Sequence, residues 1–408
     1  MKHKTLVGLW IVALLTLLLT STSAKEIESE FEFWLNTTSG GVYIDAGDKI
    51  EWSKTFGGLN SSAGYSVQLT EDGGYIIAGT TYSYGAGKSD TWLIKTDSEG
   101  NEEWSKTFGE SSWDAGCSVQ QTKNGGYIIV GYMTNSYGAG ENDVWLIKTD
   151  SKGNEEWNKT FGGAYIDWGE SVQHTNDDGY VITGSTKSYG AGEEDVWLIK
   201  TDSKGNEKWN KTFGGLDWDE GRSVQQTNDG GYILVGVTWS YGAGGRDVWL
   251  IKTDSEGNEE WNETFGGDSA DMGWSVQQTE DGGYIIVGEG NYLSIEMEVY
   301  FVVKDVWLIK ADSKGNEEWD MTLGKRFVDD IGHYVQPTDD GGYIIVGSTG
   351  SYDEDVLLIK IGPVFPTKEK PTLTPEFLTT PPTPTPSGFK AIFTIAGLLA
   401  VVYLLRKK

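Results

Sequence analysis

Hydrophobic and polar positions repeat along residues 50–361 in a block of about fifty residues. In the copy at residues 116–161, short apolar stretches alternate with turns rich in Gly, Asn and Asp; the stretches are Ser118–Thr122, Tyr127–Gly131, Asp143–Lys148 and Glu156–Phe161. Each stretch is short for a helix, and a turn such as Asn124-Gly125 suits a tight hairpin. The pattern predicts an antiparallel meander of four strands in each copy.

A four-stranded meander cannot cover both of its apolar faces by itself. Radial repetition solves this problem, because each sheet then packs face to face against its neighbours. The copies are counted at a tryptophan in the phrase Gly-Asn-x-x-Trp: Trp104, Trp157, Trp209, Trp261 and Trp319, with Trp52 as a degenerate first member. A period of this length indicates an array or a propeller. We therefore expect an all-β fold, a six-bladed β-propeller of four-stranded antiparallel blades.

The two ends of the array complement each other. The array opens with an isolated fourth strand, Ile50–Phe56, and it ends after a third strand, Asp355–Lys360. We expect the first strand to complete the last blade and to close the ring. A count of seven blades stays open, because residues 31–48 could form an additional degenerate blade.

The phrase from Lys148 to Trp157 resembles the tryptophan-docking motif of the pyrroloquinoline-quinone-like β-propellers. The resemblance covers residues 50–361 and implies that each tryptophan lies between adjacent blades, stacked on a peptide plane. Quinone-dependent members have eight blades, a pair of adjacent cysteines and a calcium-binding set. The single cysteine here is Cys117, so we expect no cofactor.

Both ends of the chain point to the cell envelope. Residues 1–24 read as a secretory signal peptide, with a basic start and a short apolar stretch. Residues 25–49 form an N-terminal segment, and residues 362–387 form a stalk rich in Thr and Pro that cannot build a core. Residues 388–408 are apolar and end in Arg406-Lys407-Lys408, so the terminal cations are expected on the cytoplasmic side.

This last segment resembles a known sorting signal. Ser387-Gly388-Phe389, followed by an apolar run with basic end residues, resembles the archaeal PGF-type C-terminal signal. In that family the helix is removed and replaced by a lipid. A plain transmembrane helix is the alternative, and both interpretations predict an extracellular protein anchored to the membrane at the cell surface.

The composition makes the expected mature protein strongly acidic. The whole chain carries a formal net charge of −29, and removal of six basic residues with the two terminal segments leaves 26 bases against 61 acids, a charge of −35. Such a surface repels nucleic acid, so no nucleic-acid partner is expected.

One column of aspartates recurs where each first strand begins. It contains Asp114, Asp167, Asp219, Asp271 and Asp330. Because first strands line the channel of a propeller, these carboxylates are weak candidates for a cation site. The alternative is a loop role, in which each side chain accepts a hydrogen bond from a backbone N–H two residues on.

The positions that differ between copies are the better candidates for binding a ligand. They lie at and around the residue after a glycine in each first strand, and the candidates are Tyr65, Trp113, Trp168, Glu170, Trp218, Arg222, Trp274 and His333. Mixed aromatic, acidic and basic side chains at one mouth of the channel are what a ligand-binding surface needs. Drift at unconstrained loop positions is the competing explanation.

Catalytic patterns are poor, and we assign no catalytic residue. Glu170 with Asp167 could form a carboxylate pair of the kind that glycosidases use, but acids are frequent in this chain. Glycosylation sequons stand at Asn36, Asn60, Asn158, Asn210 and Asn262. We expect a surface-anchored propeller for adhesion or for binding a glycan or protein ligand. The alternatives are a secreted enzyme acting on polysaccharide and a structural component of the envelope.

Overall fold

The computed structural model describes residues 54–134, 140–296, 299–324, 328–338, 340–350 and 355–363, and these residues form strands and turns. The strands make six antiparallel sheets, each in chain order. The first three sheets are β1 (Ser62–Leu69), β2 (Tyr75–Thr81), β3 (Asp90–Thr96) and β4 (Glu102–Phe108); β5 (Asp114–Gln121), β6 (Tyr127–Thr134), β7 (Asn142–Thr149) and β8 (Glu155–Phe161); and β9 (Asp167–His174), β10 (Tyr180–Thr186), β11 (Asp195–Thr201) and β12 (Glu207–Phe213). The last three are β13 (Asp219–Gln226), β14 (Tyr232–Thr238), β15 (Asp247–Thr253) and β16 (Glu259–Phe265); β17 (Met272–Gln278), β18 (Tyr284–Glu296), β19 (Val299–Ala311) and β20 (Glu317–Leu323); and β21 (Asp330–Pro337), β22 (Tyr343–Thr349) and β23 (Asp355–Ile361).

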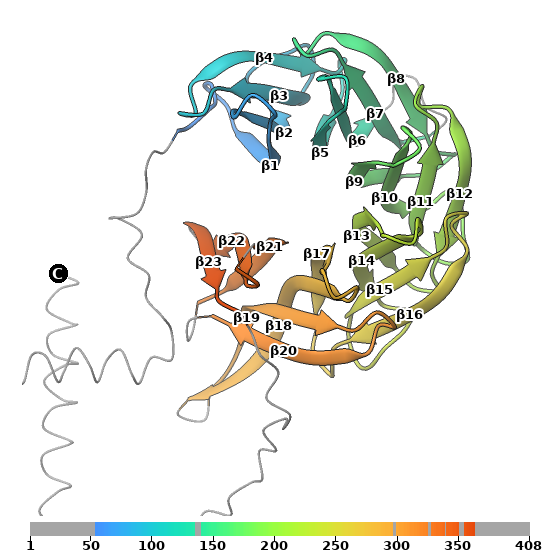
Figure 1. Ribbon diagram of the computed structural model, residues 1–408, viewed down its shortest axis with the longest axis vertical. Helices are drawn as coiled ribbons and strands as arrows, with labels where there is room; N and C mark the ends of the chain where they lie inside the picture. The colour runs from blue at the N-terminus through green and yellow to red at the C-terminus, as the bar shows by residue number, and fades with distance from the viewer. Residues whose placement is uncertain are drawn as a thin grey trace, which may run out of the picture. The chain divides into compact units, whose positions relative to one another are not determined.

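The sheets stand side by side around a common centre, with β1, β5, β9, β13, β17 and β21 innermost (Figure 1). The predicted six-bladed β-propeller is confirmed. The observed strands are longer than the expected ones, as with β6, because its pairing with β7 continues past the apolar run to Thr134. The longer step before Trp319 is taken up by the extended hairpin of β18 and β19. The possible seventh blade at residues 31–48 lies outside the described residues.

The hydrophobic core lies between blades rather than within them. At the junction of the second and third blades, Val130, Val144 and Phe161 of one sheet pack against Ile182 and Trp197 of the next. Every residue of β10 and β11 is buried, since these strands are covered on both faces. A blade therefore has a complete core only when it has neighbours.

The outer strand of each blade is docked onto the following blade by a tryptophan. Trp157 lies against Gly205 in the β11–β12 turn and contacts Tyr180, with 6.0 Å between ring centroids. Gly205 has a φ of +74°, and a Cβ at this position would lie 2.5 Å from Cζ3 of Trp157. The turn therefore needs glycine both for its backbone conformation and for its close approach to the indole.

The segment from Lys54 to Gly57 makes the same contacts with the first blade that an outer strand makes with the next blade along the chain. Lys54 Nζ donates to Asn101 Oδ1 at 2.8 Å, as Lys211 Nζ donates to Asn258 Oδ1 at the junction of the third and fourth blades. The hydroxyl of Tyr84 donates to the carbonyl of Gly57 at 2.9 Å, in the way that Tyr189 and Tyr241 bind equivalent carbonyls. These contacts are those expected of a strand that belongs to a blade preceding the first.

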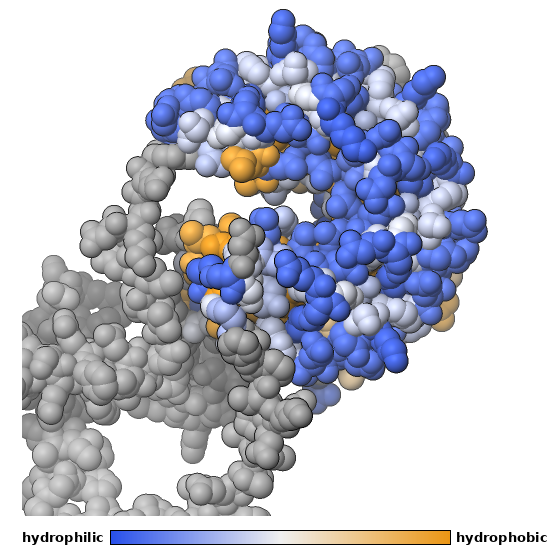
Figure 2. Space-filling view, viewed as in Figure 1, coloured by the Kyte–Doolittle hydropathy of each residue, from blue (hydrophilic) through white to orange (hydrophobic). Residues whose placement is uncertain are grey.

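The sixth blade has three strands among the described residues, and both it and the first blade expose apolar residues that are buried at the other junctions. Leu358 of β23 is 57% exposed and Val67 of β1 is 64% exposed, whereas the equivalent residues of other blades, such as Leu198 and Val172, are buried. Hydrophobic residues gather over the first and last blades on an otherwise hydrophilic surface (Figure 2).

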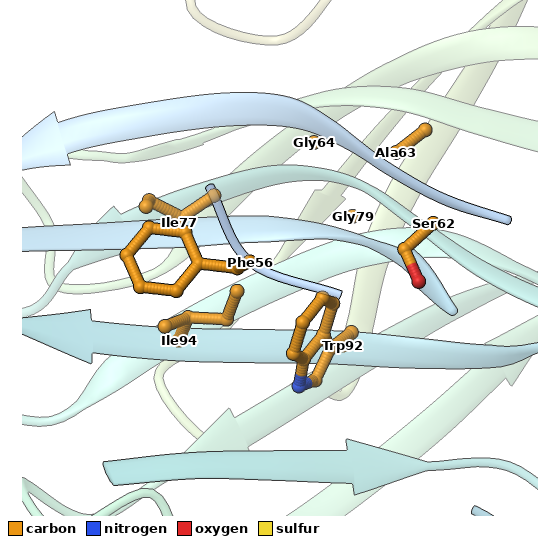
Figure 3. A pocket seen from close by; sticks show the side chains of 8 residues that line it. All are labelled: Phe56, Ser62, Ala63, Gly64, Ile77, Gly79, Trp92 and Ile94. Carbon is orange, nitrogen blue, oxygen red and sulfur yellow. The ribbon is translucent and has the colours of Figure 1, made fainter. Parts of the chain in front are cut away.

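Phe56 contributes to a pocket on the first blade, beside Ile77, Trp92 and Ile94 (Figure 3). At the junction of the second and third blades, Phe161 packs on the equivalent residues Ile182, Trp197 and Ile199. The residues 50–53 of the expected closing strand lie outside the described residues, so the completion of the sixth blade stays a prediction.

Replacement of Trp52 by Ala tests this closure. The spacing from Trp157 to Gly205 also separates Trp52 from Gly100, so we expect Trp52 to dock on the β3–β4 turn. Loss of a buried tryptophan costs about 3–5 kcal/mol, and Trp52→Ala should lower the unfolding free energy about as much as Trp157→Ala. Denaturant unfolding measures both values.

Trp34→Ala, in the segment of residues 25–49, is the matched control and should change stability little. A silent Trp52→Ala beside a severe Trp157→Ala would mean that another segment completes the sixth blade.

Candidate ligand-binding site

The variable residue of every first strand occupies a β-bulge. In β9, Gly169 pairs with Gly184 and Ser171 pairs with Thr183, so Glu170 between them has no partner in the ladder. The same irregularity occurs in all six blades, and the bulged residues are Tyr65, Cys117, Glu170, Arg222, Trp274 and His333. A bulge re-aims a side chain without ending the strand, which frees this position from the repeating core.

From the second blade to the sixth, the glycine before the bulge is required by the preceding blade. A Cβ on Gly169 would lie 2.7 Å from Cγ2 of Val130 and 2.9 Å from Cγ1 of Val144, both in the preceding blade. The invariant glycine thus serves packing, while the residue that follows it is free to vary.

Four of the bulged side chains contact one another from blade to blade. Arg222 Nη1 donates to Oε1 of Glu170 at 3.3 Å, and the Arg222 guanidinium stands 5.0 Å from the ring centroid of Trp274. Trp274 in turn meets His333 edge to face, with 5.5 Å between centroids. The structure therefore brings together the predicted candidates of the third to sixth blades around the inner strands.

Arg222 is held between two carboxylates. Its Nη2 donates to Oε2 of Glu220, two residues earlier on β13, and its Nη1 binds Glu170. Burial raises the pKa of Glu170, and the positive charge of Arg222 acts against this increase. Burial also raises the pKa of the Cys117 thiol well above its ordinary value, with the Glu170 carboxylate adding to it. Cys117 is therefore a protonated, unreactive thiol at neutral pH.

Aromatic rings line the neighbouring positions on the first-blade side of this cluster. Trp168 stacks on Tyr132 with 5.8 Å between centroids. Burial raises the pKa of Tyr132 to about 12, and nearby Cys117 and Tyr65 add to the shift. Tyr132 was not among the sequence candidates, because it stands in a strand whose repeated residues mainly serve packing.

Trp113 and Trp218 lie at the ends of the blades, one residue before β5 and β13. Trp113 meets Tyr82 edge to face at 5.9 Å, and Lys88 Nζ stands 5.1 Å from its centroid. Trp218 meets Trp239 at 6.4 Å. We call these loop positions at the ends of the strands the rim; its members Tyr82, Lys88 and Trp239 were not among the sequence candidates, whereas Trp113 and Trp218 were.

The aspartate column is buried and is used in the loops. Asp167 Oδ2 accepts hydrogen bonds from the Gly163 N–H at 2.8 Å and from Ser188 Oγ at 2.7 Å, and its Oδ1 accepts one from Thr186 Oγ1. Asp219 makes the equivalent bonds in the fourth blade. The backbone donor lies four residues before each aspartate rather than two after it. Among the described residues, no group of three His, Cys, Asp or Glu side chains is placed to hold a metal ion.

A second row of aspartates, at the start of the third strands, lies beside the first row. The backbone of Gly214 separates Asp195 from Asp219, since a Cβ there would lie 1.8 Å from the former and 2.9 Å from the latter. Burial raises the pKa of Asp247 to about 6; the Ala243 N–H bond acts against the shift, and the charge of Asp271 adds to it. This row was not among the sequence candidates, because the recurring phrase Asp-Val-Trp-Leu-Ile-Lys has the pattern of a strand.

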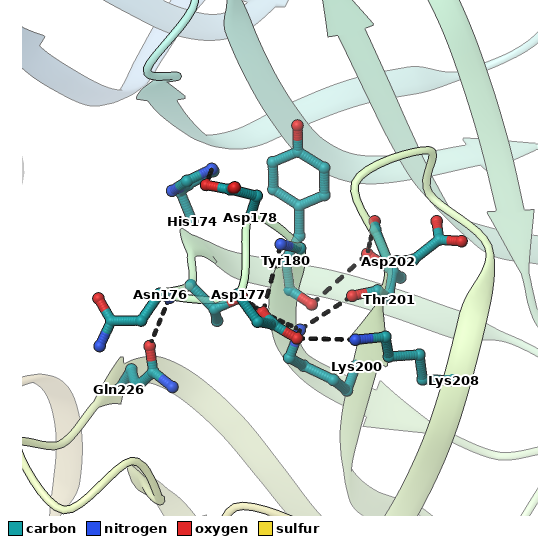
Figure 4. Close-up of polar contacts among 12 residues, drawn as sticks. His174, Asn176, Asp177, Asp178, Tyr180, Lys200, Thr201, Asp202, Lys208 and Gln226 are labelled. Atoms are coloured by element: carbon teal, nitrogen blue, oxygen red, sulfur yellow. Dashed lines mark hydrogen bonds and ion pairs between the residues drawn. The ribbon is translucent and has the colours of Figure 1, made fainter.

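His174 lies at the far end of β9 from Asp167, beside an Asp–Lys ion pair that recurs in other blades (Figure 4). Asp177 binds both Lys200 Nζ at 2.8 Å and Lys208 Nζ at 2.7 Å. Its neighbour Asp178 has a φ of +62°, where the other described blades have glycine. Burial lowers the pKa of His174, so this histidine is neutral at neutral pH.

Three of the predicted sequons share one place on the outer strands. Asn158, Asn210 and Asn262 are exposed, and each donates to a glutamate three residues earlier. Oδ1 of Asn210 also accepts from Trp197 Nε1 at 3.2 Å, which explains the recurrence of asparagine there. Asn60 donates to the carbonyl of Tyr82, and Asn36 lies outside the described residues.

A family model described as the PGF-CTERM motif matches residues 388–408. This match confirms the sorting signal, and the protein is therefore anchored to the membrane at the cell surface. Within the part of the chain that the structure describes, no helix is long and apolar enough to span a membrane. The signal peptide and the anchor lie outside that part.

No curated protein matches the chain in sequence. Among solved structures, the Neurospora crassa Pan2 WD40 domain is similar at 7% identity, over 74% of this chain and 80% of that one, with a TM-score of 0.45. Puromycin hydrolase is similar at 12% identity over 75% and 47%, with a TM-score of 0.45, and a glucose dehydrogenase at 10% identity over 74% and 96%, with a TM-score of 0.40. These matches do not test the resemblance to the pyrroloquinoline-quinone-like propellers, which stays a prediction.

Replacement of Asp247 by Asn tests how much the ionisation of this buried carboxyl, beside Asp271, destabilises the fold. A buried carboxyl whose pKa is raised to about 6 stabilises the fold fully below pH 3.8, and this contribution is lost as the pH rises through 6. The unfolding free energy of Asp247→Asn relative to the wild type should therefore increase between pH 4 and pH 7, by at most about 3 kcal/mol. Denaturant unfolding across this range measures the difference.

Asp254→Asn is the matched control, because hydrogen bonds from Asn258 lower the pKa of Asp254. A carboxylate of this kind contributes stability above its unfolded pKa, so the relative stability of this variant should fall as the pH rises. A flat profile for Asp247→Asn would contradict the raised pKa.

Proposed function

We propose that this propeller binds carbohydrate at the cell surface, through the bulged residues of its inner strands. The observation that carries the proposal is the concentration of variation at one structural position. In an array whose core residues recur almost unchanged, the bulge holds a different side chain in each blade. Side chains from consecutive blades then contact each other across the junctions.

The chemistry of this set suits sugars. Aromatic rings such as Trp274 and Trp168 offer flat apolar surfaces for the C–H faces of pyranose rings. The planar groups of Arg222, Glu170 and Glu220 offer donors and acceptors for paired hydroxyl groups. The local charge is one cation against two carboxylates, which disfavours a small anion as the ligand.

Binding accounts for the arrangement better than hydrolysis does. A glycosidase needs two carboxyl groups that face the same bond. Both oxygens of Asp167 accept hydrogen bonds from loop groups, whereas Glu170 is paired with Arg222. These different partners support a binding protein over an enzyme that uses this pair, and the surface anchor supports adhesion to envelope or external polysaccharide.

The proposal predicts binding of purified full-length protein to some members of a panel of envelope and plant polysaccharides. Trp274→Ala should weaken this binding by about 10-fold or more, because it removes a stacking surface. Lys204→Ala, on an exposed turn, is the control and should leave the affinity unchanged. Calorimetry or a pull-down measures the affinity, with unfolding curves to show that the variants are folded.

Absence of binding to any polysaccharide would contradict the proposal. Depolymerisation that Glu170→Gln abolishes would identify the protein as an enzyme, and binding to an envelope protein alone would identify a protein ligand.

The finer form of the anchor is also a proposal: the C-terminal helix is replaced by a lipid. Intact-mass analysis of the native protein should then show the residues after about 388 missing and a lipid mass in their place. A native chain that retains Lys408 would mean that the protein keeps a plain transmembrane helix.

A further inference from the structure

Two tryptophans of the rim, Trp218 and Trp239, contact each other, and neither of them is a bulged residue. Trp218 and Trp239 meet edge to face and are 45% and 37% exposed. Their backbones are joined, because the Trp239 N–H donates to the Trp218 carbonyl at 2.9 Å, and Trp218 also forms a bridge with Glu194 of the third blade. The two indoles are therefore held in place by the strand ends and still present surface to solvent.

Cations stand over both rings of this pair. Lys187 Nζ lies 4.7 Å from the ring centroid of Trp218, and the Arg246 guanidinium lies 5.7 Å from that of Trp239. Each cation comes from a different blade, so the pair and its cations exist only in the assembled propeller. Cation–π contacts of this kind orient the charges toward the aromatic surface.

Buried carboxylates hold these cations in position. Lys187 Nζ lies 3.4 Å from Oε2 of Glu194, which is almost fully buried. Fully buried Glu289 binds Arg246 at 3.3 Å and also Lys304 at 3.1 Å. Three partly exposed cations are thus held beside two buried carboxylates, on a protein whose net charge is −29.

These positions vary between copies of the repeat. The position of Trp239 is Tyr82 in the first blade, Lys187 in the third and Gly350 in the sixth. The position of Trp218 is Trp113 in the second blade and Ala270 in the fifth. A core requirement would have kept these positions alike, so their convergence in one place points to recognition rather than packing.

We propose that the Trp218–Trp239 pair, with Lys187 and Arg246, is a subsite for an acidic sugar unit of a polysaccharide. The indoles would take the C–H face of a pyranose ring, and the two cations would bind its carboxylate or sulfate group. This inference rests on the proposed carbohydrate binding and names its substrate class. The acidic protein surface around the patch would disfavour anionic polymers that lack a sugar face for the indoles.

The test compares oligogalacturonate, sulfated dextran and unsubstituted dextran as ligands for the purified full-length protein. We expect the acidic ligands to bind at least about 10-fold more tightly than dextran, with an affinity that falls as salt is added. The comparison between the two acidic ligands shows whether a carboxylate or a sulfate is preferred. Ligand binding should also change the tryptophan fluorescence.

Two variants locate the binding. Trp239→Ala and Lys187→Gln should each remove most of the preference for acidic ligands, whereas Lys152→Gln, an exposed lysine on the β7–β8 turn, should not. Trp239→Phe keeps an aromatic ring and should retain part of the affinity, which separates a contact with ligand from a loss of folding.

The outcomes distinguish this inference from the proposed function. Binding of neutral polysaccharide without preference for acidic sugars, or a preference that Trp239→Ala leaves intact, would overturn the subsite and leave carbohydrate binding standing. Absence of binding to every polysaccharide, neutral or acidic, would overturn both.

Discussion

The contact of each outer-strand tryptophan with the next blade supports the rest of the structure. Trp157 packs on Gly205 and Tyr180 of the following blade, and the same contact recurs from Trp104 to Trp261. An indole buries a large apolar area, and here it covers the one strand of the meander that has no neighbour on its outer side. Blades joined in this way share their cores, so the array is stable as a unit.

Residues that join the blades and residues that vary occupy different positions of the repeat, and this separation explains where substitutions are tolerated. From the second blade to the sixth, the glycine before the bulge approaches the preceding blade closely, and the residues after it enter the shared core. The bulged residue belongs to neither surface, and the rim residues stand beyond the ends of the strands. Substitution at these positions leaves the docking contacts intact, so different blades can carry Glu170, Arg222 or Trp274 on the same backbone.

The carboxylates of the molecule also differ between the exposed turns and the junctions of the blades. Turn carboxylates such as Asp254 and Asp202 have pKa values lowered by hydrogen bonds from asparagine, and they keep the surface negative. Burial raises the pKa of Asp195 and of Asp247 at the blade junctions, and a neighbouring aspartate adds to each shift. The partly exposed cations at Trp218 and Trp239 are exceptions on this acidic surface, held there by the buried Glu194 and Glu289.

The sequence by itself determined the four-stranded meander, the six blades and the cell-surface anchor, because these depend on local periodicity, on repetition and on a terminal signal. It also identified Glu170, Arg222, Trp274 and His333 as positions of interest, since they differ where the copies otherwise agree. Only the tertiary structure decided that Arg222 is shared by Glu170 and Glu220, and that Trp239 and Lys187 join Trp218. These contacts join residues of different loops and blades, and their geometry depends on the bulges and on how neighbouring blades pack, which no local pattern encodes.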